Sequence, residues 1–204
     1  MHYYKKAFDV EYLEQAKHVV LTGNDNNKEK FQQETDFLIT VIEQHIKIDS
    51  NSLILDFGCG MGRISRELIR KFDCEVYGQD ISDTMLQFAL VYTSTVNVKK
   101  FHAVKHYNRE NSIDVALSIL VLQHTEDPKK ELDRIYKVLK PNGDFILVNE
   151  NKRFIPVGVD SDRYVVWHDD GFDVKGYADS LFNLTNEVQY LETDKSVFFY
   201  KKQL

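Results

Sequence analysis

The sequence predicts an α/β domain built on a mostly parallel sheet, and three observations point to it. Short apolar runs alternate with stretches of helical periodicity through residues 52–149, the pattern of parallel strands joined by crossover helices. The run IDVALSILVL at 113–122 is apolar on both faces, as expected for a central strand of a parallel sheet. A glycine-rich turn follows the apolar run at 52–57, at the edge where such sheets bind ligands.

Individual elements follow from apolar spacing and from capping residues. Ser82 has the character of a helix N-cap, and Asp127 followed by Pro128 has the character of an N-cap and first helical residue. The predicted strands are 52–57, 74–80, 98–104, 113–122 and a run that enters 149 after Gly143. The predicted helices are 3–20, 31–47, one from about 62, one after Ser82, and one after Asp127 that closes at Pro141 and Gly143.

The C-terminal part of the chain differs in character. Residues 151–180 are rich in Asp, Gly and aromatic residues and are interpreted as irregular. The runs 186–193 and 195–202 are separated by a few polar residues and predict an antiparallel hairpin. We expect one domain over 1–204, which consists of an N-terminal helical lid at 1–30, a cofactor-binding core at 52–149 and a substrate-lid insertion at 151–180.

Composition narrows the class of protein. The chain has 204 residues and a formal net charge of −6, which argues against a nucleic-acid surface because phosphate binding needs clustered Lys and Arg. Neither a signal peptide nor a membrane span is expected, since no apolar run is long enough. Cys59 and Cys74 have no metal-type spacing and indicate no disulfide framework. A cytoplasmic protein with neither a resident metal nor a membrane partner is expected.

The glycines of LILDFGCGMGRISREL, residues 53–68, need a physical reason, since glycine costs conformational entropy. A glycine turn at the exit of a buried strand lets a ligand approach the backbone, and the following helix supplies free N–H groups. Asp80 ends the next predicted strand, where an acidic side chain can accept ribose hydroxyls. The combination favours a cofactor that contains a nucleoside. The alternative is a tight turn that needs glycine for packing alone.

The spacing of the turn distinguishes between cofactors. A dinucleotide loop has its third glycine three positions after the second, and this chain has Arg63 there. The observed form, Asp56-x-Gly58-x-Gly60-x-Gly62, resembles the first motif of the class I S-adenosylmethionine-dependent methyltransferases. The resemblance continues through VYGQDIS at 76–82, SIDVALSILVLQH at 112–124 and LKPNGDFILV at 139–148. It covers roughly residues 35–150, with the motifs in the family's order.

This resemblance implies a Rossmann-like seven-stranded sheet, mostly parallel with an antiparallel C-terminal hairpin, and helices on both faces. It also implies that S-adenosyl-L-methionine is the cofactor. Many members of the family place an acidic residue after the third strand for the adenine amino group, whereas this chain has Val104, Lys105 and His106, so that contact stays unassigned. By resemblance, the glycine turn borders the methionine part of the cofactor and Asp80 holds the ribose hydroxyls. Ile81 and Met85 flank the adenine, and the exit of the fourth strand lies near the transferred methyl group. The cofactor residues that the resemblance implies are Asp56, Gly58, Cys59, Gly60, Gly62, Asp80, Ile81, Met85 and Leu120.

Two histidines are candidate catalytic residues. His124 follows the fourth strand, and its alternative reading is a structural histidine packed at a strand end. His168 precedes Asp169 and Asp170 in YVVWHDDGFD, where this family often builds its substrate lid, and it is predicted to act as base or orienter. The alternatives for that stretch are a solvated loop or part of a metal site.

Aromatic side chains are the candidate walls of the substrate pocket: Tyr164 and Trp167 in the insertion, and Tyr4 in the N-terminal helix. Ordinary core packing is the alternative for Tyr4 and its neighbour Tyr3. Residues 160–179 contain six Asp against Arg163 and Lys175. This acidic bias suits a cationic or polyhydroxyl substrate, and its alternative is solubility.

The function that these residues favour is S-adenosylmethionine-dependent methylation of a small molecule, on oxygen rather than nitrogen, with a sugar or another metabolite as acceptor. The alternatives are an N-methyltransferase and a non-catalytic protein that binds S-adenosylmethionine. A nicotinamide oxidoreductase is disfavoured by Arg63. The sequence names neither the acceptor nor the oligomeric state.

Overall fold

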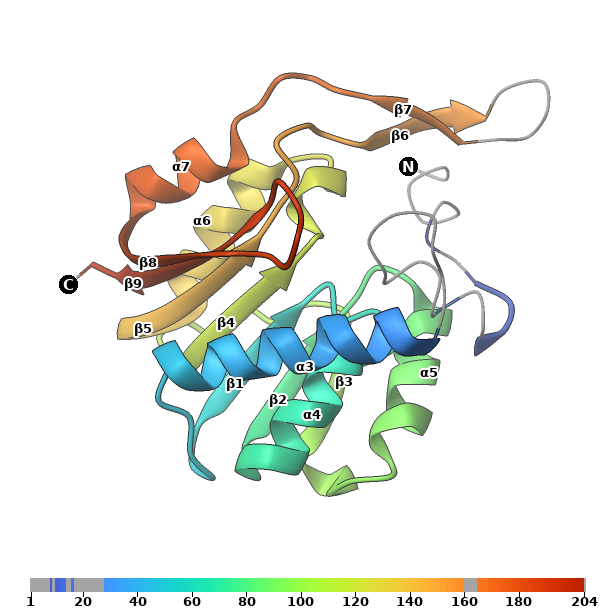
Figure 1. Cartoon of the computed structure of the whole chain (residues 1–204), viewed down its shortest axis with the longest axis vertical. Coiled ribbons are helices and arrows are strands. Elements are labelled where there is room, and N and C mark those ends of the chain that lie inside the picture. Colours follow the sequence, from blue (N-terminus) through green and yellow to red (C-terminus); the bar gives the residue numbers. More distant parts are fainter. Residues whose placement is uncertain (1–7, 9, 14–15, 17–27, 160–164, 204) are drawn as a thin grey trace.

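A seven-stranded sheet forms the centre of the protein (Figure 1). The computed structural model describes residues 8, 10–13, 16, 28–159 and 165–203. The strand order is β3-β2-β1-β4-β5-β9-β8, and β9 alone runs antiparallel to its neighbours in this sheet. The predicted sheet and C-terminal hairpin are therefore confirmed. The strands are β1 Leu53–Phe57, β2 Glu75–Gln79, β3 Phe101–Val104, β4 Ile113–Ile119, β5 Leu139–Val148, β8 Phe182–Gln189 and β9 Ser196–Lys202.

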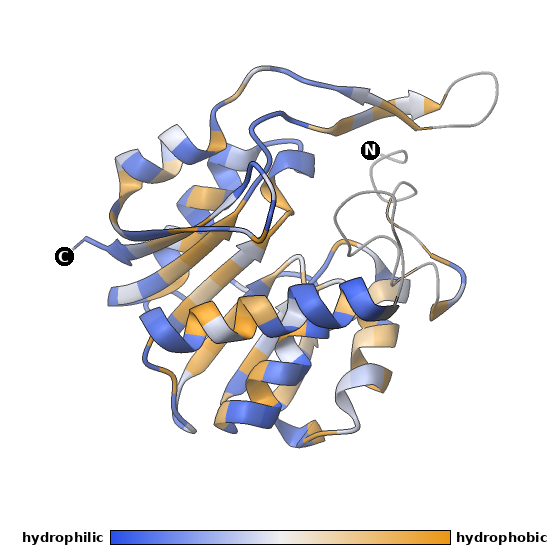
Figure 2. Ribbon diagram, viewed as in Figure 1, coloured by the Kyte–Doolittle hydropathy of each residue, from blue (hydrophilic) through white to orange (hydrophobic). Residues whose placement is uncertain are grey.

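Helices cover both faces of the sheet, as predicted. Buried residues of α3, α4 and α5 share one hydrophobic core with the sheet, and those of α6 and α7 share the other. Figure 2 shows hydrophobic residues along the central strands between these two layers. The helices are α3 Lys28–His45, α4 Arg63–Phe72, α5 Asp83–Thr93, α6 Pro128–Val138 and α7 Val174–Leu181.

Both predicted N-caps are present. The Ser82 hydroxyl accepts a hydrogen bond from the Met85 N–H at 3.2 Å, and the Asp127 carboxylate accepts one from the Lys130 N–H at 2.9 Å. Pro128 occupies the first turn of α6, where its missing N–H is not needed. These caps fix where α5 and α6 begin, and hence where the loops before them face the ends of the strands.

Two predicted strands are shorter than expected. The strand predicted over 113–122 ends at Ile119, because Leu120 has φ +57° and leaves the extended conformation. A short 3₁₀ helix, η2 Leu122–His124, follows. The strand predicted over 98–104 begins only at Phe101, after a 3₁₀ turn, η1 Val98–Lys100.

The closure expected at Pro141 and Gly143 for the helix after Asp127, which is α6, is wrong. The helix ends at Val138, and Leu139 already pairs with Ile113 in the sheet. The register then shifts before Val115 pairs with Asp144. The Pro-containing stretch is therefore an irregularity within β5, since proline supplies no N–H for a regular ladder.

The segment interpreted as irregular, 151–180, has regular structure. It contains a separate antiparallel pair, β6 Ile155–Val159 and β7 Val165–His168, and helix α7. The pair extends away from α7 above the sheet (Figure 1). The hairpin strand β8 also begins at Phe182, four residues earlier than predicted. The helix predicted over 3–20 lies largely outside the described residues. Within the described ranges, every helix is too short or too polar to cross a bilayer.

Candidate active site

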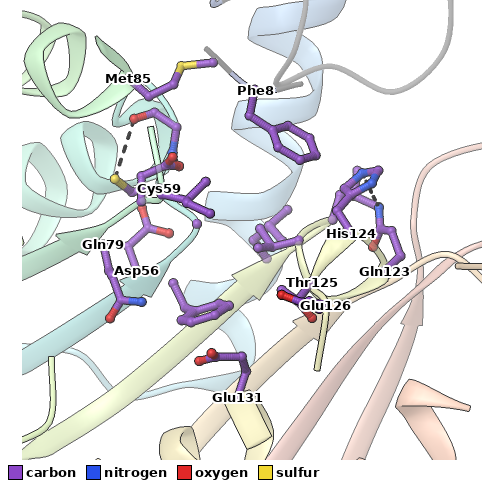
Figure 3. Close-up of a pocket in the computed structure, with 18 of the residues that line it drawn as sticks. Phe8, Asp56, Cys59, Gln79, Met85, Gln123, His124, Thr125, Glu126 and Glu131 are labelled. Atoms are coloured by element: carbon purple, nitrogen blue, oxygen red, sulfur yellow. Dashed lines mark hydrogen bonds between the residues drawn. The ribbon is translucent and has the colours of Figure 1, made fainter. Parts of the chain in front are cut away.

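A cavity of about 1010 Å³ lies at the carboxyl ends of β1, β2 and β4. Ligand pockets span roughly 300–1,000 Å³, so this cavity has room for two small molecules side by side. In Figure 3 the ring of Phe8 points toward His124, and Asp56 and Gln79 lie on the opposite side. The cavity therefore lies where open α/β sheets bind their ligands.

The glycine turn forms one wall of the cavity. Gly58, Gly60 and Gly62 have φ values of +77°, +52° and +79°, a region that side chains disfavour. The N–H groups of Gly58 and Cys59 both donate to the Gln79 carbonyl, at 2.7 and 2.9 Å. The turn is thus fastened to β2 by backbone bonds, and glycine is needed for its conformation.

The space left by two of these glycines is filled by the protein. A Cβ on Gly58 would lie 2.3 Å from Val121 Cγ2, and one on Gly62 would lie 3.2 Å from Ala89 Cβ. Gly58 also lines the cavity, whereas Gly62 does not. At these two positions the packing alternative holds, because the absent side chains make room for neighbouring residues.

Asp80 connects the glycine turn to the start of α5. One carboxylate oxygen accepts from the Gly60 N–H and the other from the Ser82 N–H, both at 2.9 Å. Burial raises the pKa of Asp80, while these hydrogen bonds and Lys105 lower it. Each carboxylate oxygen has a further lone pair, so Asp80 can also accept hydrogen bonds from hydroxyl groups of a ligand in the cavity.

An apolar surface lies beside Asp80. The side chain of Ile81 is 50% exposed and that of Met85 is 2% exposed, and both line the cavity. The exposed side chain of Ile81 can make a hydrophobic contact with a flat ring of a ligand, close to the Asp80 carboxylate that accepts hydrogen bonds from hydroxyl groups. Cys59 completes this wall as a buried thiol whose pKa is raised by burial, so it stays protonated.

We expect alanine at position 80 to weaken binding of S-adenosylhomocysteine by about 1–3 kcal/mol, the range for a hydrogen bond to a charged group. The loss has two sources, because Asp80 both faces the cavity and holds the Gly60 N–H. Calorimetry on Asp80→Ala measures the change. Asp83→Ala, which removes a carboxylate three positions later that ion-pairs with Lys105, is the matched control. An unchanged Kd in folded Asp80→Ala would refute the ribose assignment.

Asp56 is a buried carboxyl at the end of β1, 3% exposed. The Ser65 hydroxyl donates to its Oδ2 at 2.6 Å. Burial raises the pKa of Asp56 from 3.8 to about 6, and the charge of Asp80 acts in the same direction. Near neutral pH the folded protein therefore holds this charge at a cost in stability.

We predict that Asp56→Asn stabilises the ligand-free protein by about 2–3 kcal/mol at pH 8 and by almost nothing at about pH 4. The folded carboxyl has the higher pKa, so the wild type loses stability as pH rises from 3.8 toward about 6. Asparagine does not titrate and can still accept the Ser65 hydrogen bond. Urea unfolding at the two pH values measures the gain, with exposed Asp194→Asn as control. An equal gain at both pH values would contradict the assignment.

His124 lies on the opposite wall, in η2, and its environment determines its tautomer. Its Nδ1 is 2.9 Å from the Phe154 carbonyl oxygen, which can only accept, so Nδ1 carries the proton. Nε2 then has the lone pair, with the Gln123 side-chain amide nitrogen 3.4 Å away. Burial lowers the pKa of His124, the Phe154 carbonyl opposes that shift and Arg153 adds to it. The ring is therefore neutral at pH 7.

Aromatic rings surround His124. Its ring centroid lies 5.2 Å from that of Phe8, 5.6 Å from that of Trp167 and 6.1 Å from that of Phe154. The centroids of Phe8 and Trp167 are 6.3 Å apart. All four residues line the cavity, so in this part of the cavity wall aromatic rings surround one neutral imidazole. We call these four residues the aromatic corner.

The structure places the second histidine elsewhere. His168 is exposed and does not line the cavity; it neighbours Trp167 in strand β7, where successive side chains point to opposite faces. Asp169 accepts from the backbone N–H groups of Arg153 and Gly171 at 3.3 and 2.9 Å, which lower its pKa. Asp169 thus holds the loop between β7 and α7 through these backbone bonds. Tyr4 and Tyr164 lie outside the described residues.

No group of three or more His, Cys, Asp or Glu side chains suited to a metal ion occurs in the part of the chain that the structure describes. Of the residues proposed for the cofactor, all but Gly62 line the cavity; these are Asp56, Gly58, Cys59, Gly60, Asp80, Ile81, Met85 and Leu120. Leu120 holds its φ of +57° through an N–H bond to the Val148 carbonyl at 2.7 Å.

Sequence reasoning missed residues that reach the cavity from the helices. Arg134 of α6 donates to the Gln79 side-chain oxygen at 2.8 Å, and the same oxygen accepts from the Tyr107 N–H at 2.9 Å. Arg63, at the start of α4, forms a buried ion pair with Glu34 of α3 at 3.4 Å. Charged residues on amphipathic helices have no local signal that distinguishes these roles from solvent exposure.

Comparison with known proteins identifies the domain. Residues 55–147 match the family model described as a methyltransferase domain. Phosphoethanolamine N-methyltransferase 2 from Caenorhabditis elegans is 30% identical over 131 residues, which cover 62% of this chain and 29% of that protein. The mitochondrial ubiquinone biosynthesis O-methyltransferase from Dictyostelium discoideum is 27% identical over 116 residues, which cover 50% of this chain and 36% of that protein. The chain thus spans about a third of the length of these curated relatives.

Solved structures share the fold. A protein from Pyrococcus horikoshii OT3 has a TM-score of 0.69 at 22% identity, with 95% of this chain and 100% of that chain covered. An S-adenosylmethionine-dependent methyltransferase from Mesorhizobium loti has a TM-score of 0.62 at 16% identity, with 84% and 100% covered. The matched methyltransferase domain and this shared fold together support a class I S-adenosylmethionine-dependent methyltransferase. The methyl donor of that class is S-adenosylmethionine.

The residues present fit that donor. The glycine turn exposes backbone to the cavity at Gly58 and Gly60, and Asp80 faces the same space beside the exposed side chain of Ile81. A carboxylate for hydroxyls next to an apolar surface for a flat ring suits the adenosine part. The buried carboxyl of Asp56 suits the positively charged methionine part.

Proposed function

We propose that this protein transfers a methyl group from S-adenosylmethionine to a hydroxyl group of a small molecule, a sugar or another metabolite, with His124 as general base. The observation that carries the proposal is the neutral, oriented imidazole of His124 in the same cavity as the glycine turn and Asp80. The printed names of the relatives support a small-molecule acceptor, since they include enzymes of phosphoethanolamine, ubiquinone biosynthesis and sterols.

The cofactor is held by residues that line the cavity at and near the glycine turn: Asp56, Gly58, Cys59, Gly60, Asp80, Ile81, Met85 and Leu120. When bound, it supplies a methyl group on a positively charged sulfur that leaves as a neutral thioether. The protein aligns the acceptor with this carbon and excludes water. Asp80 and the turn provide the fixed reference for that alignment, since each is fastened to the other.

His124 is the group that removes the acceptor's proton. The Phe154 carbonyl keeps the proton on Nδ1, so Nε2 carries the lone pair, and a hydroxyl group of the acceptor would replace the long contact between Nε2 and Gln123. We assign the base to His124 rather than to exposed His168, and we propose Trp167 as a wall of the acceptor pocket. The roles of Tyr4 and Tyr164 remain predictions.

We also propose that the chain acts as one domain in which 52–149 hold the cofactor and 151–180 cover the acceptor. Phe154 and Trp167 support this division, because both reach the cavity from the second segment. The lid at 1–30 and a cytoplasmic location remain predictions from the sequence. An N-methyltransferase is the second candidate, favoured by the aromatic rings near His124, since ring faces attract cations.

Binding of the cofactor tests the proposal first. We expect calorimetry to show binding of S-adenosylmethionine and S-adenosylhomocysteine, and none of NADH. Transfer of isotopically labelled methyl to a panel of hydroxyl and amine acceptors then separates O- from N-methylation. Binding of NADH without either sulfur compound would contradict the proposed function, and binding of the cofactor without transfer to any acceptor would support a non-catalytic protein.

A further inference from the structure

Four separate segments build the aromatic corner. Phe8 comes from the N-terminal segment, His124 from η2, Phe154 from the chain before β6, and Trp167 from β7. Trp167 is 43% exposed although its neighbours in space are aromatic. A half-exposed indole beside a phenyl ring and an imidazole leaves flat apolar surface in the cavity, which an aromatic ring can cover with favourable stacking geometry.

A buried positive charge lies behind this corner. The side chain of Arg153 is 1% exposed; its Nη2 donates to the Thr125 carbonyl at 2.5 Å and lies 3.6 Å from Asp170 Oδ2. Its Nε and Nη1 have no hydrogen-bond partner among the described residues. The charge is close enough to lower the pKa of His124, and so it also disfavours a second cation at the imidazole.

Three carboxylates near the corner have other partners or lie in solvent: Asp170 pairs with Arg153, Glu150 pairs with Lys195 at 3.1 Å, and Glu126 is exposed. The corner therefore combines flat apolar surface with the buried, ion-paired guanidinium of Arg153. Because that charge lowers the pKa of His124, it disfavours an acceptor that carries a positive charge.

The strength of the base points the same way. A neutral histidine is a weak base, with an ordinary pKa of about 6.5. A phenolic hydroxyl has a pKa of about 10, whereas the pKa of an aliphatic hydroxyl is far higher and close to that of water. Proton transfer is more efficient when the two pKa values are closer, so His124 is suited to a phenol and poorly suited to a sugar hydroxyl.

We infer that the aromatic corner is a subsite for a phenol, a planar ring that carries the hydroxyl to be methylated. This inference rests on the proposed function and narrows its acceptor class. The ring packs against Phe8 and Trp167, and its hydroxyl faces Nε2 of His124. The phenolic proton passes to Nε2, an oxygen lone pair forms the new O–CH₃ bond, and the bond from that carbon to sulfur breaks with its electron pair left on sulfur.

The single tryptophan of the chain makes a direct binding test possible. In isotope-labelled full-length protein loaded with S-adenosylhomocysteine, Trp167 gives the one indole N–H resonance in the NMR spectrum. Phenol is expected to shift this resonance saturably, with a Kd about fivefold lower than that of cyclohexanol, which has the same size and hydroxyl but no aromatic ring. Tetramethylammonium and glucose are expected to leave the resonance in place.

Two variants link the shift to the corner. Phe8→Leu is expected to raise the Kd of phenol to that of cyclohexanol, and Phe154→Leu provides the same test should Phe8→Leu not fold. Phe72→Leu, at the far end of α4, is the matched control and should leave the Kd unchanged. Backbone amide dispersion reports whether each variant is folded.

The remaining outcomes overturn the inference. A resonance that phenol does not shift, an equal or lower Kd for cyclohexanol, or tighter binding of tetramethylammonium would each exclude a phenol subsite. Failure of S-adenosylhomocysteine to bind would refute the proposed function itself. Bound S-adenosylhomocysteine without a phenol shift refutes the acceptor class and leaves the proposed function intact.

Discussion

Replacing His124 with alanine is expected to lower kcat at least about a hundredfold, the lower range for loss of a general base. The Kd for S-adenosylhomocysteine should stay near that of the wild type, because His124 lies across the cavity from Asp56 and from Cys59 of the glycine turn (Figure 3). Steady-state kinetics with an identified acceptor and calorimetry without it measure the two effects. His124→Gln should behave like the alanine variant, since glutamine can still donate to the Phe154 carbonyl but cannot take a proton.

The pH dependence of kcat gives an independent check on the same residue. The active form is the neutral imidazole, and burial lowers its pKa below 6.5. Activity should therefore be constant above pH 6.5 and should fall as pH decreases through the lowered pKa. The variants at position 124 should lose this limb of the profile. If His168→Ala lost activity and His124→Ala did not, the base would lie on β7 and the assignment would be wrong.

Gly60→Val is expected to abolish detectable cofactor binding. Gly60 has φ +52°, which a β-branched residue adopts only at considerable cost, and its N–H donates to Asp80 in the cavity wall. Valine would distort the turn and place a branched side chain where backbone faces the ligand. Calorimetry with S-adenosylhomocysteine measures the loss, and circular dichroism reports whether the variant is folded.

Gly158→Val is the matched control for this substitution. Gly158 lies in β6, no atom lies within 4 Å of the position that its Cβ would take, and it is not part of the cavity wall. The control should bind the cofactor normally. Wild-type affinity in folded Gly60→Val would mean that Gly60 serves the conformation of the turn and does not serve the ligand.

The sheet and most of its elements could be predicted from the sequence, because the signals involved are local. Apolar periodicity fixed the order of strands and helices, and the caps at Ser82 and Asp127 fixed where two helices begin. The glycine turn, together with Asp80 after the next strand, indicated a cofactor that contains a nucleoside, and the resemblance of the motifs to a known family implied the methyl donor; these residues do meet at one edge of the sheet. Each signal depends on residues a few positions apart or on the common direction of parallel strands.

Tertiary structure decided what depends on contacts between distant segments. Gly58 must be glycine because Val121 fills its space, and His124 has its tautomer because the carbonyl of Phe154, thirty positions away, accepts a hydrogen bond from its Nδ1–H. The insertion interpreted as irregular pairs β6 with β7, which brings Trp167 to the cavity and leaves His168 exposed. Neither periodicity nor spacing encodes such pairs, since the energies that select them arise only when the sheet has brought the segments into contact.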